Sequence, residues 1–179
     1  MLTYLPGDLI YDVFNQLSSL LKSDSHLYLA FSGGLDSTCL LHMVSEYVKV
    51  HPSHQLTAIH RDHRLHDDSS TWLDHCRKQA ESLNVTFISR CVQVSRQKKG
   101  LEAAAREARW AAFSDIVAND ESAVLLLAHH ADDQVETFLL RSLRGSGVSG
   151  LSSISYSSTY AGIAVYRPFL FIQKSQLFN

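Results

Sequence analysis

The chain has 179 residues, 45% of them hydrophobic and 19% charged, which is enough to form a core and excludes a disordered, coiled-coil or collagen-like protein. Sixteen Lys and Arg against 18 Asp and Glu give a net charge of −2, which argues against nucleic-acid binding by bulk charge. No apolar run reaches the roughly 18 residues of a membrane helix, and the three cysteines form no CxxC motif. We therefore expect a soluble, cytoplasmic protein with reduced thiols and no membrane association.

Short apolar runs alternate with longer segments of helical periodicity along the chain. Residues 1–23 are expected to form a leading amphipathic helix that packs on the same domain as the rest. The predicted strands are 27–31, 57–59, 85–92, 124–128 and 163–166, and the predicted helices between them are 36–50, 69–83, 101–118 and 134–144. The stretch 145–158 is rich in Gly and Ser and is expected to be a loop inside the domain.

Strands separated by helices of about ten or more residues indicate right-handed crossover connections and hence a parallel sheet. The expected fold class is α/β, a doubly wound open parallel sheet of about five strands with helices on both faces. Residues 24–179 are assigned to this one domain.

The sharpest motif is residues 32–37, Ser-Gly-Gly-Leu-Asp-Ser, between a predicted strand and a predicted helix. Two glycines allow a tight turn, and the exposed N–H groups of a helix N-terminus favour an anion. The hydroxyls of Ser32 and Ser37 can donate to phosphate oxygens, whereas Asp36 has the wrong charge unless a Mg²⁺ bridges it to the phosphates. A capped Gly-Gly turn is the simpler alternative, but the order of strand, loop and helix favours a phosphate-binding loop.

Two more polar clusters follow predicted strands, at residues 60–66 and 129–136. In the second, Asp133 and Glu136 are three residues apart and share one face of the first helical turn. Helix capping is the alternative for these acids, and a solvated loop is the alternative for residues 60–66. Ligands of open parallel sheets bind at the carboxyl ends of the strands, so we expect all three clusters at one site.

The region between residues 90 and 109 holds six basic and two acidic residues. Lys98 and Lys99 fit a solvated helix face. Arg106 and Arg109 are three residues apart, and their guanidinium groups suit a polyanion.

These motifs resemble the N-type ATP pyrophosphatases, the PP-loop superfamily, whose fold is called adenine nucleotide alpha hydrolase-like. Residues 32–37 resemble the pyrophosphate loop of that superfamily. Other segments are similar to one of its families, the tRNA(Ile)-lysidine synthetases. These segments are residues 60–65, 100–110, 128–137, 144–147 and 167–170.

The resemblance implies an enzyme, an ATP-dependent ligase that forms a C–N bond. ATP adenylates the wobble cytidine of the minor isoleucine tRNA with a CAU anticodon, and free L-lysine then displaces AMP to give lysidine. The modified anticodon reads AUA instead of AUG. ATP and Mg²⁺ are the implied cofactors, tRNA(Ile) and L-lysine the implied partners, and a homodimer is a candidate assembly.

The resemblance also implies roles for individual residues. The implied nucleotide-binding set is Ser32, Gly33, Gly34, Leu35, Asp36, Ser37, His60 and Arg106. The implied catalytic set is Asp36, Asp133, Glu136, His129 and Arg109, with Asp36 and Asp133 binding the metal. In this assignment Asp133 and Glu136 bind metal or orient lysine, while His129, Arg106 and Arg109 line the nucleotide and cytidine pocket.

The sequence departs from the family in two places. Arg64 stands where the family usually has Gly, so the loop around it is expected to differ. The sequence ends at Asn179, where family members continue into the rest of the catalytic domain and then tRNA-binding domains. We therefore expect this chain to bind ATP, to bind tRNA weakly and to make little or no lysidine.

Three alternatives stay open at this point. A tRNA thiolase would need catalytic cysteines, but Cys39, Cys76 and Cys91 lie in no recognisable motif. A metal-dependent phosphohydrolase would use a dinuclear site, built from His60, Asp62, His63, His129, His130 and Asp133. The third alternative is a non-catalytic remnant that only binds nucleotide.

Overall fold

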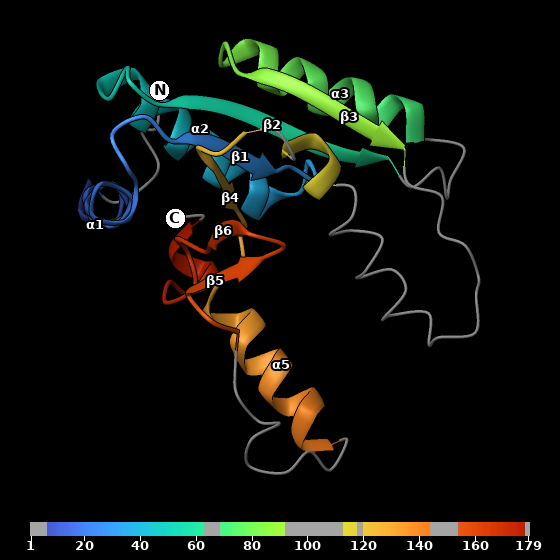
Figure 1. Ribbon diagram of the computed structural model, residues 1–179. Coiled ribbons are helices and arrows are strands. Elements are labelled where there is room, and N and C mark those ends of the chain that lie inside the picture. The colour runs from blue at the N-terminus through green and yellow to red at the C-terminus, as the bar shows by residue number, and fades with distance from the viewer. Residues whose placement is uncertain (1–6, 63–68, 92–112, 118–119, 144–153, 178–179) are drawn as a thin grey trace.

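The computed structural model describes residues 7–62, 69–91, 113–117, 120–143 and 154–177 (Figure 1). Its elements are α1 (Gly7–Leu20), β1 (His26–Ala30), α2 (Leu35–Val50), β2 (Gln55–Asp62), α3 (Ser69–Ser82), β3 (Thr86–Cys91), β4 (Ala123–Leu126), α5 (Ala131–Leu143), β5 (Ser157–Tyr160), β6 (Ile163–Tyr166) and the 3-10 helix η2 (Lys174–Leu177). Of the predicted helix 101–118, the described part is 113–117, and it is helical.

The described strands form one six-stranded sheet in the order β3-β2-β1-β4-β6-β5. β1 lies between β2 and β4 and runs parallel to both, so that Leu27 is opposite Leu56 on one side and Val124 on the other. β2 and β3 are also parallel, as are β4 and β6. The predicted α/β fold with an open, mainly parallel sheet is therefore confirmed.

The sixth strand was missed by the sequence analysis. β5 is antiparallel to β6, and it begins within the stretch predicted to be a loop. Its sequence, Ser-Ser-Thr-Tyr, leaves three of four residues exposed, so it carries no apolar strand signal. A tight turn at Ala161 and Gly162, both with positive φ, reverses the direction of the chain between β5 and β6. β5 is therefore held by its backbone pairing with β6.

Alternating side chains of the strands build a core on each face of the sheet. Leu27 and Leu29 of β1 belong to the larger core, with the buried faces of α1, α2 and α3. Tyr28 belongs to the smaller core, which includes Phe113 and Val117 of the helical segment 113–117. The described helices thus cover both faces, as a doubly wound sheet requires.

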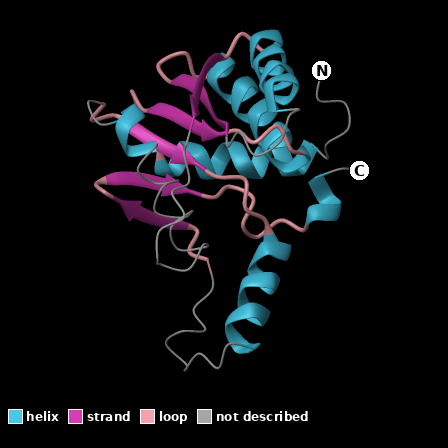
Figure 2. Ribbon diagram, turned by 90° about the vertical axis from the view of Figure 1, so that its right-hand side faces the viewer, coloured by secondary structure: helices cyan, strands magenta, loops and turns pink. Residues whose placement is uncertain are grey.

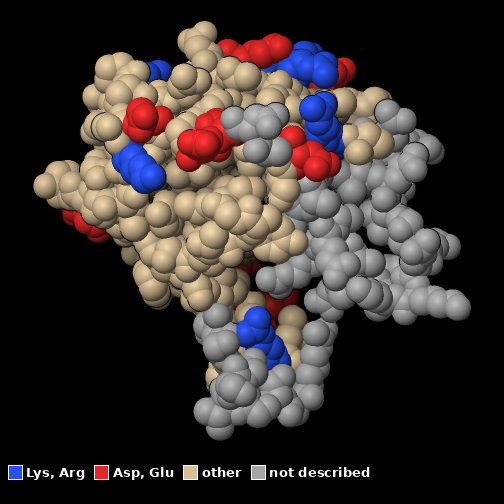
Figure 3. Space-filling view, in the orientation of Figure 1, with Lys and Arg blue, Asp and Glu red and all other residues tan. Residues whose placement is uncertain are grey.

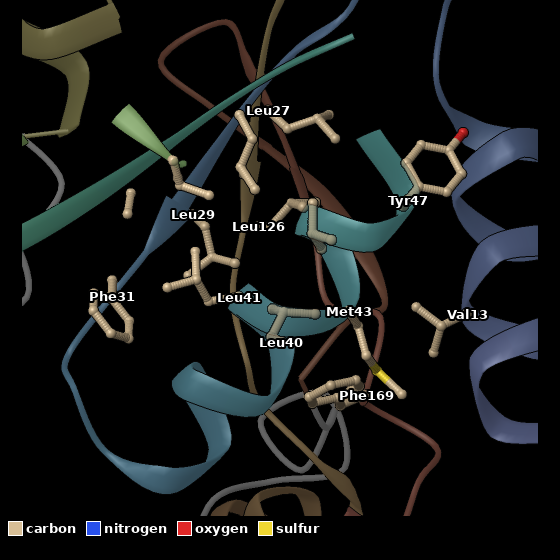
Figure 4. Packing of buried hydrophobic residues seen from close by; sticks show 14 of the residues in the cluster. Val13, Leu27, Leu29, Phe31, Leu40, Leu41, Met43, Tyr47, Leu126 and Phe169 are labelled. Carbon is tan, nitrogen blue, oxygen red and sulfur yellow. The ribbon is translucent and has the colours of Figure 1, made fainter. Parts of the chain in front are cut away.

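Figure 4 shows the larger core. Leu40 and Leu41 of α2 lie close to the β1 side chains, and Met43 extends toward Val13 of α1. Phe14 of α1 meets Tyr47 of α2 edge to face, with ring centroids 5.3 Å apart. The amphipathic helix α1 therefore buries its apolar face against α2.

α5 extends away from the rest of the described chain in both ribbon views (Figures 1 and 2). It buries none of its residues, but its first turn is anchored. The N–H of Ala131 donates to the carbonyl of Ile172 at 2.9 Å. The Gln134 amide pairs with the backbone of Ile154 in both directions, at 2.7 and 2.8 Å. None of the described helices is long and apolar enough to cross a membrane.

A polar network ties the beginning of β1 to the residues before β4. His26 Nδ1 lies 2.9 Å from Asp120 Oδ2, and the Tyr28 hydroxyl donates to the same oxygen at 2.9 Å. Ser122 donates to Oδ1 through both its N–H and its hydroxyl. Burial alone would raise the pKa of Asp120, but the hydrogen bonds from Ser122 and Tyr28 and the nearby His26 lower it below its ordinary value. Burial and the Asp120 carboxylate raise the pKa of Tyr28 to about 12.

This network makes the stability of the fold depend on pH. Because the folded chain ionises Asp120 at a lower pH than the unfolded chain, its contribution is present above about pH 4 and is lost as the pH falls through the folded pKa. D120N should lower the free energy of unfolding by about 1–3 kcal/mol at pH 7. Its stability should also fall less steeply below pH 4 than that of the wild type, as measured by urea denaturation. Parallel curves for the two proteins at low pH would contradict this assignment.

Candidate functional site

The loop between β1 and α2 is held closed by its own side chains. Ser32 Oγ accepts the N–H of Gly34 at 3.2 Å and lies 3.0 Å from Ser37 Oγ. The Ser37 hydroxyl donates to the Gly34 carbonyl at 2.9 Å. No side chain caps α2 at Gly34, so the capped turn considered as an alternative is not what forms. The N–H groups of the first turn are left for an anion.

Gly33 is required by its conformation and by its surroundings. Its φ is +79°, and a Cβ built on it would lie 2.4 Å from Cys76 Sγ and 3.1 Å from the Trp72 indole. Both neighbours belong to α3, which therefore packs directly against the loop backbone. Only glycine fits this position without moving α3.

His60 lies beneath the loop. β2 extends through it to Asp62, beyond the predicted end of the strand. The His60 ring is buried, lies 6.1 Å from the Phe87 ring, and its Nδ1 donates to the carbonyl of Phe31 at 2.8 Å. A contact between His60 and the nucleotide stays a prediction; what the structure shows is a residue that holds the loop backbone.

The second polar cluster lies beside the loop. The sheet order places β4 beside β1, where the chain reverses its direction of winding, and ligands of such sheets bind at that point. His130 Nε2 is 3.7 Å from Asp36 Oδ1, and His130 Nδ1 is 3.5 Å from Asp133 Oδ2. The buried His130 ring thus stands between two carboxylates contributed by segments far apart in the sequence.

Asp36 has one further neighbour and one unsatisfied oxygen. Lys174 of η2 places its Nζ 3.5 Å from Asp36 Oδ2. Asp36 Oδ1 is buried and accepts no hydrogen bond from any described residue. Mg²⁺ binds through one or two carboxylate oxygens, waters and substrate phosphates. An orphaned carboxylate oxygen beside a phosphate loop fits that ion, so Asp36 can hold a magnesium that neutralises phosphate charge.

The α5 carboxylates have different environments. Asp133 Oδ2 accepts the backbone N–H of His130 at 2.8 Å, which is the helix-capping role considered as the alternative. Glu136, one turn later, is exposed. Asp133 is half-buried, and its carboxylate also lies close to the His130 ring. It can therefore cap the helix and still bind a metal or a substrate.

His130 and Lys174 lie beside Asp36, but neither was among the nucleotide-binding or catalytic residues predicted from the sequence. His129 is half-buried, while its neighbour His130, expected only in the phosphohydrolase alternative, makes the contact with Asp36. Lys174 carried no signal because it lies far from the loop in sequence and outside every motif. Arg106, Arg109 and Arg64 lie outside the described residues.

The phosphohydrolase alternative finds no support in the described part of the chain. There, no group of three or more His, Cys, Asp or Glu side chains is arranged to hold a metal ion. His60 faces the Phe31 carbonyl and His130 faces Asp36, so these two do not share a centre. His63 and the side chain of Asp62 lie outside the description.

Cys39 and Cys76, the two cysteines that are not fully exposed, are poor nucleophiles. Burial, with a smaller effect of the Asp36 charge, raises the pKa of Cys39 to about 11. Burial likewise raises the pKa of Cys76 to about 11, and Cys91 is exposed on β3. A thiol with such a pKa is protonated at neutral pH and is a poor nucleophile. The thiolase alternative is therefore disfavoured by the chemistry of these side chains.

Charge on the described surface is mixed. On the face shown in Figure 3, Lys and Arg side chains are interspersed with Asp and Glu, without a continuous patch of one sign among the described residues there. At the site itself, the loop N–H donors and Lys174 are the described groups suited to an anion.

The glycine loop after β1 and the acidic side chains beside it, in an open parallel sheet, define a nucleotide-binding α/β domain with a pyrophosphate loop. Residues 9–179 match the PP-loop domain, and the chain belongs to this family. The resemblance to lysidine synthetases is also confirmed. The chain is 40% identical over 170 residues to "tRNA(Ile)-lysidine synthase" of Histophilus somni (strain 2336), and 43% identical over 162 residues to that of Serratia proteamaculans (strain 568).

These matches cover 95% and 90% of the chain but only 39% and 37% of the relatives, so the chain spans about two fifths of their length. Among solved structures, the U34-tRNA thiolase NcsA from Methanococcus maripaludis, with its [4Fe-4S] cluster, superposes with a TM-score of 0.76. That similarity covers 95% of this chain and 61% of the other at 17% identity, and it shows a shared fold alone.

The close packing of α3 on the loop can be tested by comparing two glycines. Gly33 and Gly162 have similar positive φ values, +79° and +84°, but a Cβ on Gly162 would meet nothing within 4 Å. G162A should therefore cost only the backbone strain, about 1–2 kcal/mol. G33A should cost about 2–5 kcal/mol, because it must also displace Cys76. Urea denaturation measures both, and equal losses would show that α3 does not press on the loop.

Proposed function

We propose that this chain is the ATP-binding part of an enzyme that forms lysidine. In this proposal ATP adenylates the wobble cytidine of the isoleucine tRNA with a CAU anticodon, and L-lysine then displaces AMP. Membership of the PP-loop family supports the use of ATP, and the relatives named tRNA(Ile)-lysidine synthase support the reaction. A cytoplasmic location follows from the substrate, and a homodimer remains a prediction.

The observation that carries the proposal is the juxtaposition of Asp36 and His130, whose side chains lie 3.7 Å apart. It brings the phosphate loop and the first turn of α5, with Asp133, together at the carboxyl edge of the sheet. A triphosphate bound to the loop would therefore lie next to Asp133 and near Glu136. An ATP-dependent ligase needs this combination of an anion cradle and nearby carboxylates.

Each part of the site has a chemical task in this proposal. The N–H groups and serine hydroxyls of residues 32–37 bind the phosphates and stabilise charge on the departing pyrophosphate. Bound Mg²⁺ would neutralise phosphate charge, with Asp36 as its main protein ligand and Asp133 as the second. Lysine must attack as a neutral amine, so Asp133 or Glu136 would orient it or accept its proton.

The remaining assignments complete the pocket. His129 follows β4 at the same edge of the sheet, where it would line the nucleotide and cytidine pocket. Arg106 and Arg109 would contribute guanidinium groups to that pocket. Lys174 balances the Asp36 charge and would supply a positive charge beside the bound phosphates.

The metal assignment predicts the behaviour of D36A. This variant should lose the Mg²⁺-dependent part of ATP affinity, because it removes the buried carboxylate oxygen beside the loop that no described residue hydrogen-bonds. Isothermal titration calorimetry with and without Mg²⁺ measures that part, and circular dichroism checks the fold. The matched control is D74A, since Asp74 is an exposed acid on α3 paired with Arg77. Unchanged Mg²⁺ dependence in D36A would refute the assignment.

The α5 acids should affect chemistry more than ATP binding. Glu136 is exposed and caps nothing, so E136Q should leave the fold intact. D133N keeps an oxygen that can accept the His130 N–H, so the cap should also survive. In a protein of the relatives' full length, both variants should lower the rate of lysine incorporation at least about tenfold with little change in ATP affinity. Normal turnover in either variant would remove that residue from the mechanism.

A further inference from the structure

The phosphate loop can bind an anion only if its N–H groups point toward the ligand. A peptide bond is planar and trans, so fixing the direction of one carbonyl also fixes the N–H of the next residue in the opposite direction. Side chains that hold the carbonyls of residues 31 and 32 therefore determine where the N–H groups of Ser32 and Gly33 point. The structure contains one donor for each of these two carbonyls.

His60 is the donor for the first carbonyl. Its Nδ1 donates to Phe31 from beneath the loop at 2.8 Å, so the Ser32 N–H points away from β2. Trp72 is the donor for the second. Its indole Nε1 donates to the Ser32 carbonyl at 2.8 Å from α3, so the Gly33 N–H points away from α3. Neither N–H donates a hydrogen bond within the described chain.

Trp72 is held in place for this contact. Its ring packs against Gly33 and stacks on His75 with centroids 5.2 Å apart. Trp72 is nevertheless 48% exposed, whereas a tryptophan whose role is to fill a core is mostly buried. The indole N–H donates to the Ser32 carbonyl, on one side of the peptide bond between Ser32 and Gly33. The Gly33 N–H, on the opposite side of that peptide, faces the place where phosphate would bind.

We propose that Trp72 is a positioning residue for the phosphates of ATP. Its indole N–H holds the Ser32 carbonyl toward α3 and so presents the Gly33 N–H to the ligand before the ligand arrives. This inference rests on the proposed ATP site and adds a residue that lies outside the phosphate-loop motif. Preorganised donors bind more tightly because no reorientation is needed on binding.

The test removes the N–H and keeps the ring. In W72F, and in a chain with benzothienylalanine at position 72, the aromatic packing remains but the indole donor is absent. Affinity for Mg-ATP and for tripolyphosphate, the probe of the loop alone, should fall together by about two- to twelvefold, the range for one hydrogen bond. The control H75A removes the stacking partner but not the donor and should bind both ligands like the wild type.

The outcomes separate this inference from the proposed function. If the wild-type chain binds neither ligand, the ATP site itself is wrong and the inference falls with it. If the wild type binds both and the benzothienylalanine chain binds equally well, the ATP site stands and Trp72 acts only by packing. Should W72F fail to fold by circular dichroism, the isosteric benzothienylalanine chain decides alone. Loss of affinity in that chain, with wild-type binding in H75A, supports the positioning role.

Discussion

The site depends on the parallel pairing of β1 with a strand on each side. β2 follows β1 closely in sequence, whereas β4 joins from much later in the chain. α2 and α3 pack on one face of the sheet, and the helical segment 113–117, which precedes β4, packs on the other. This reversal leaves the carboxyl ends of β1 and β4 without a connection crossing above them. The loop before α2 and the first turn of α5 therefore face each other, and Asp36 meets His130. Without the β1–β4 ladder each segment would be an ordinary strand-to-helix connection.

Several residues of the functional motifs form hydrogen bonds that stabilise the fold. Gln134 pairs with the backbone of Ile154, and Asp133 caps the helix on which it lies. Arg167 is buried and donates to the Ser155 carbonyl at 2.8 Å. A family motif therefore contains supports as well as reacting groups, and a loss of activity on substitution does not by itself distinguish them. This is why E136Q, at an exposed position without a structural contact, is more informative than any change at Gln134 or Arg167.

The sequence predicted the architecture well because the alternation of buried strands and amphipathic helices is strongly encoded, as in residues 27–31. It also located the phosphate loop, because Gly33 satisfies a backbone requirement that few other residues can meet. It missed β5, whose polar residues are stabilised by pairing with β6 and not by burial. It did not indicate that His130 lies beside Asp36, because His129 and His130 fall between a strand and a helix, where neither the strand period nor the helix period gives the direction of a side chain. Lys174 reaches Asp36 only through the folded path of the chain.

The packing of Cys76 beneath Gly33 has a consequence for thiol chemistry. Cys76 is fully buried, and its thiol occupies the space that a Gly33 side chain would need, so an alkylating reagent can reach it only when α3 separates from the loop. Cys91 is exposed and reacts without any opening, which provides an internal reference in the same molecule. The ratio of the two labelling rates therefore reports how often this part of the protein opens. A ligand that binds the closed loop would slow the labelling of Cys76 and leave that of Cys91 unchanged.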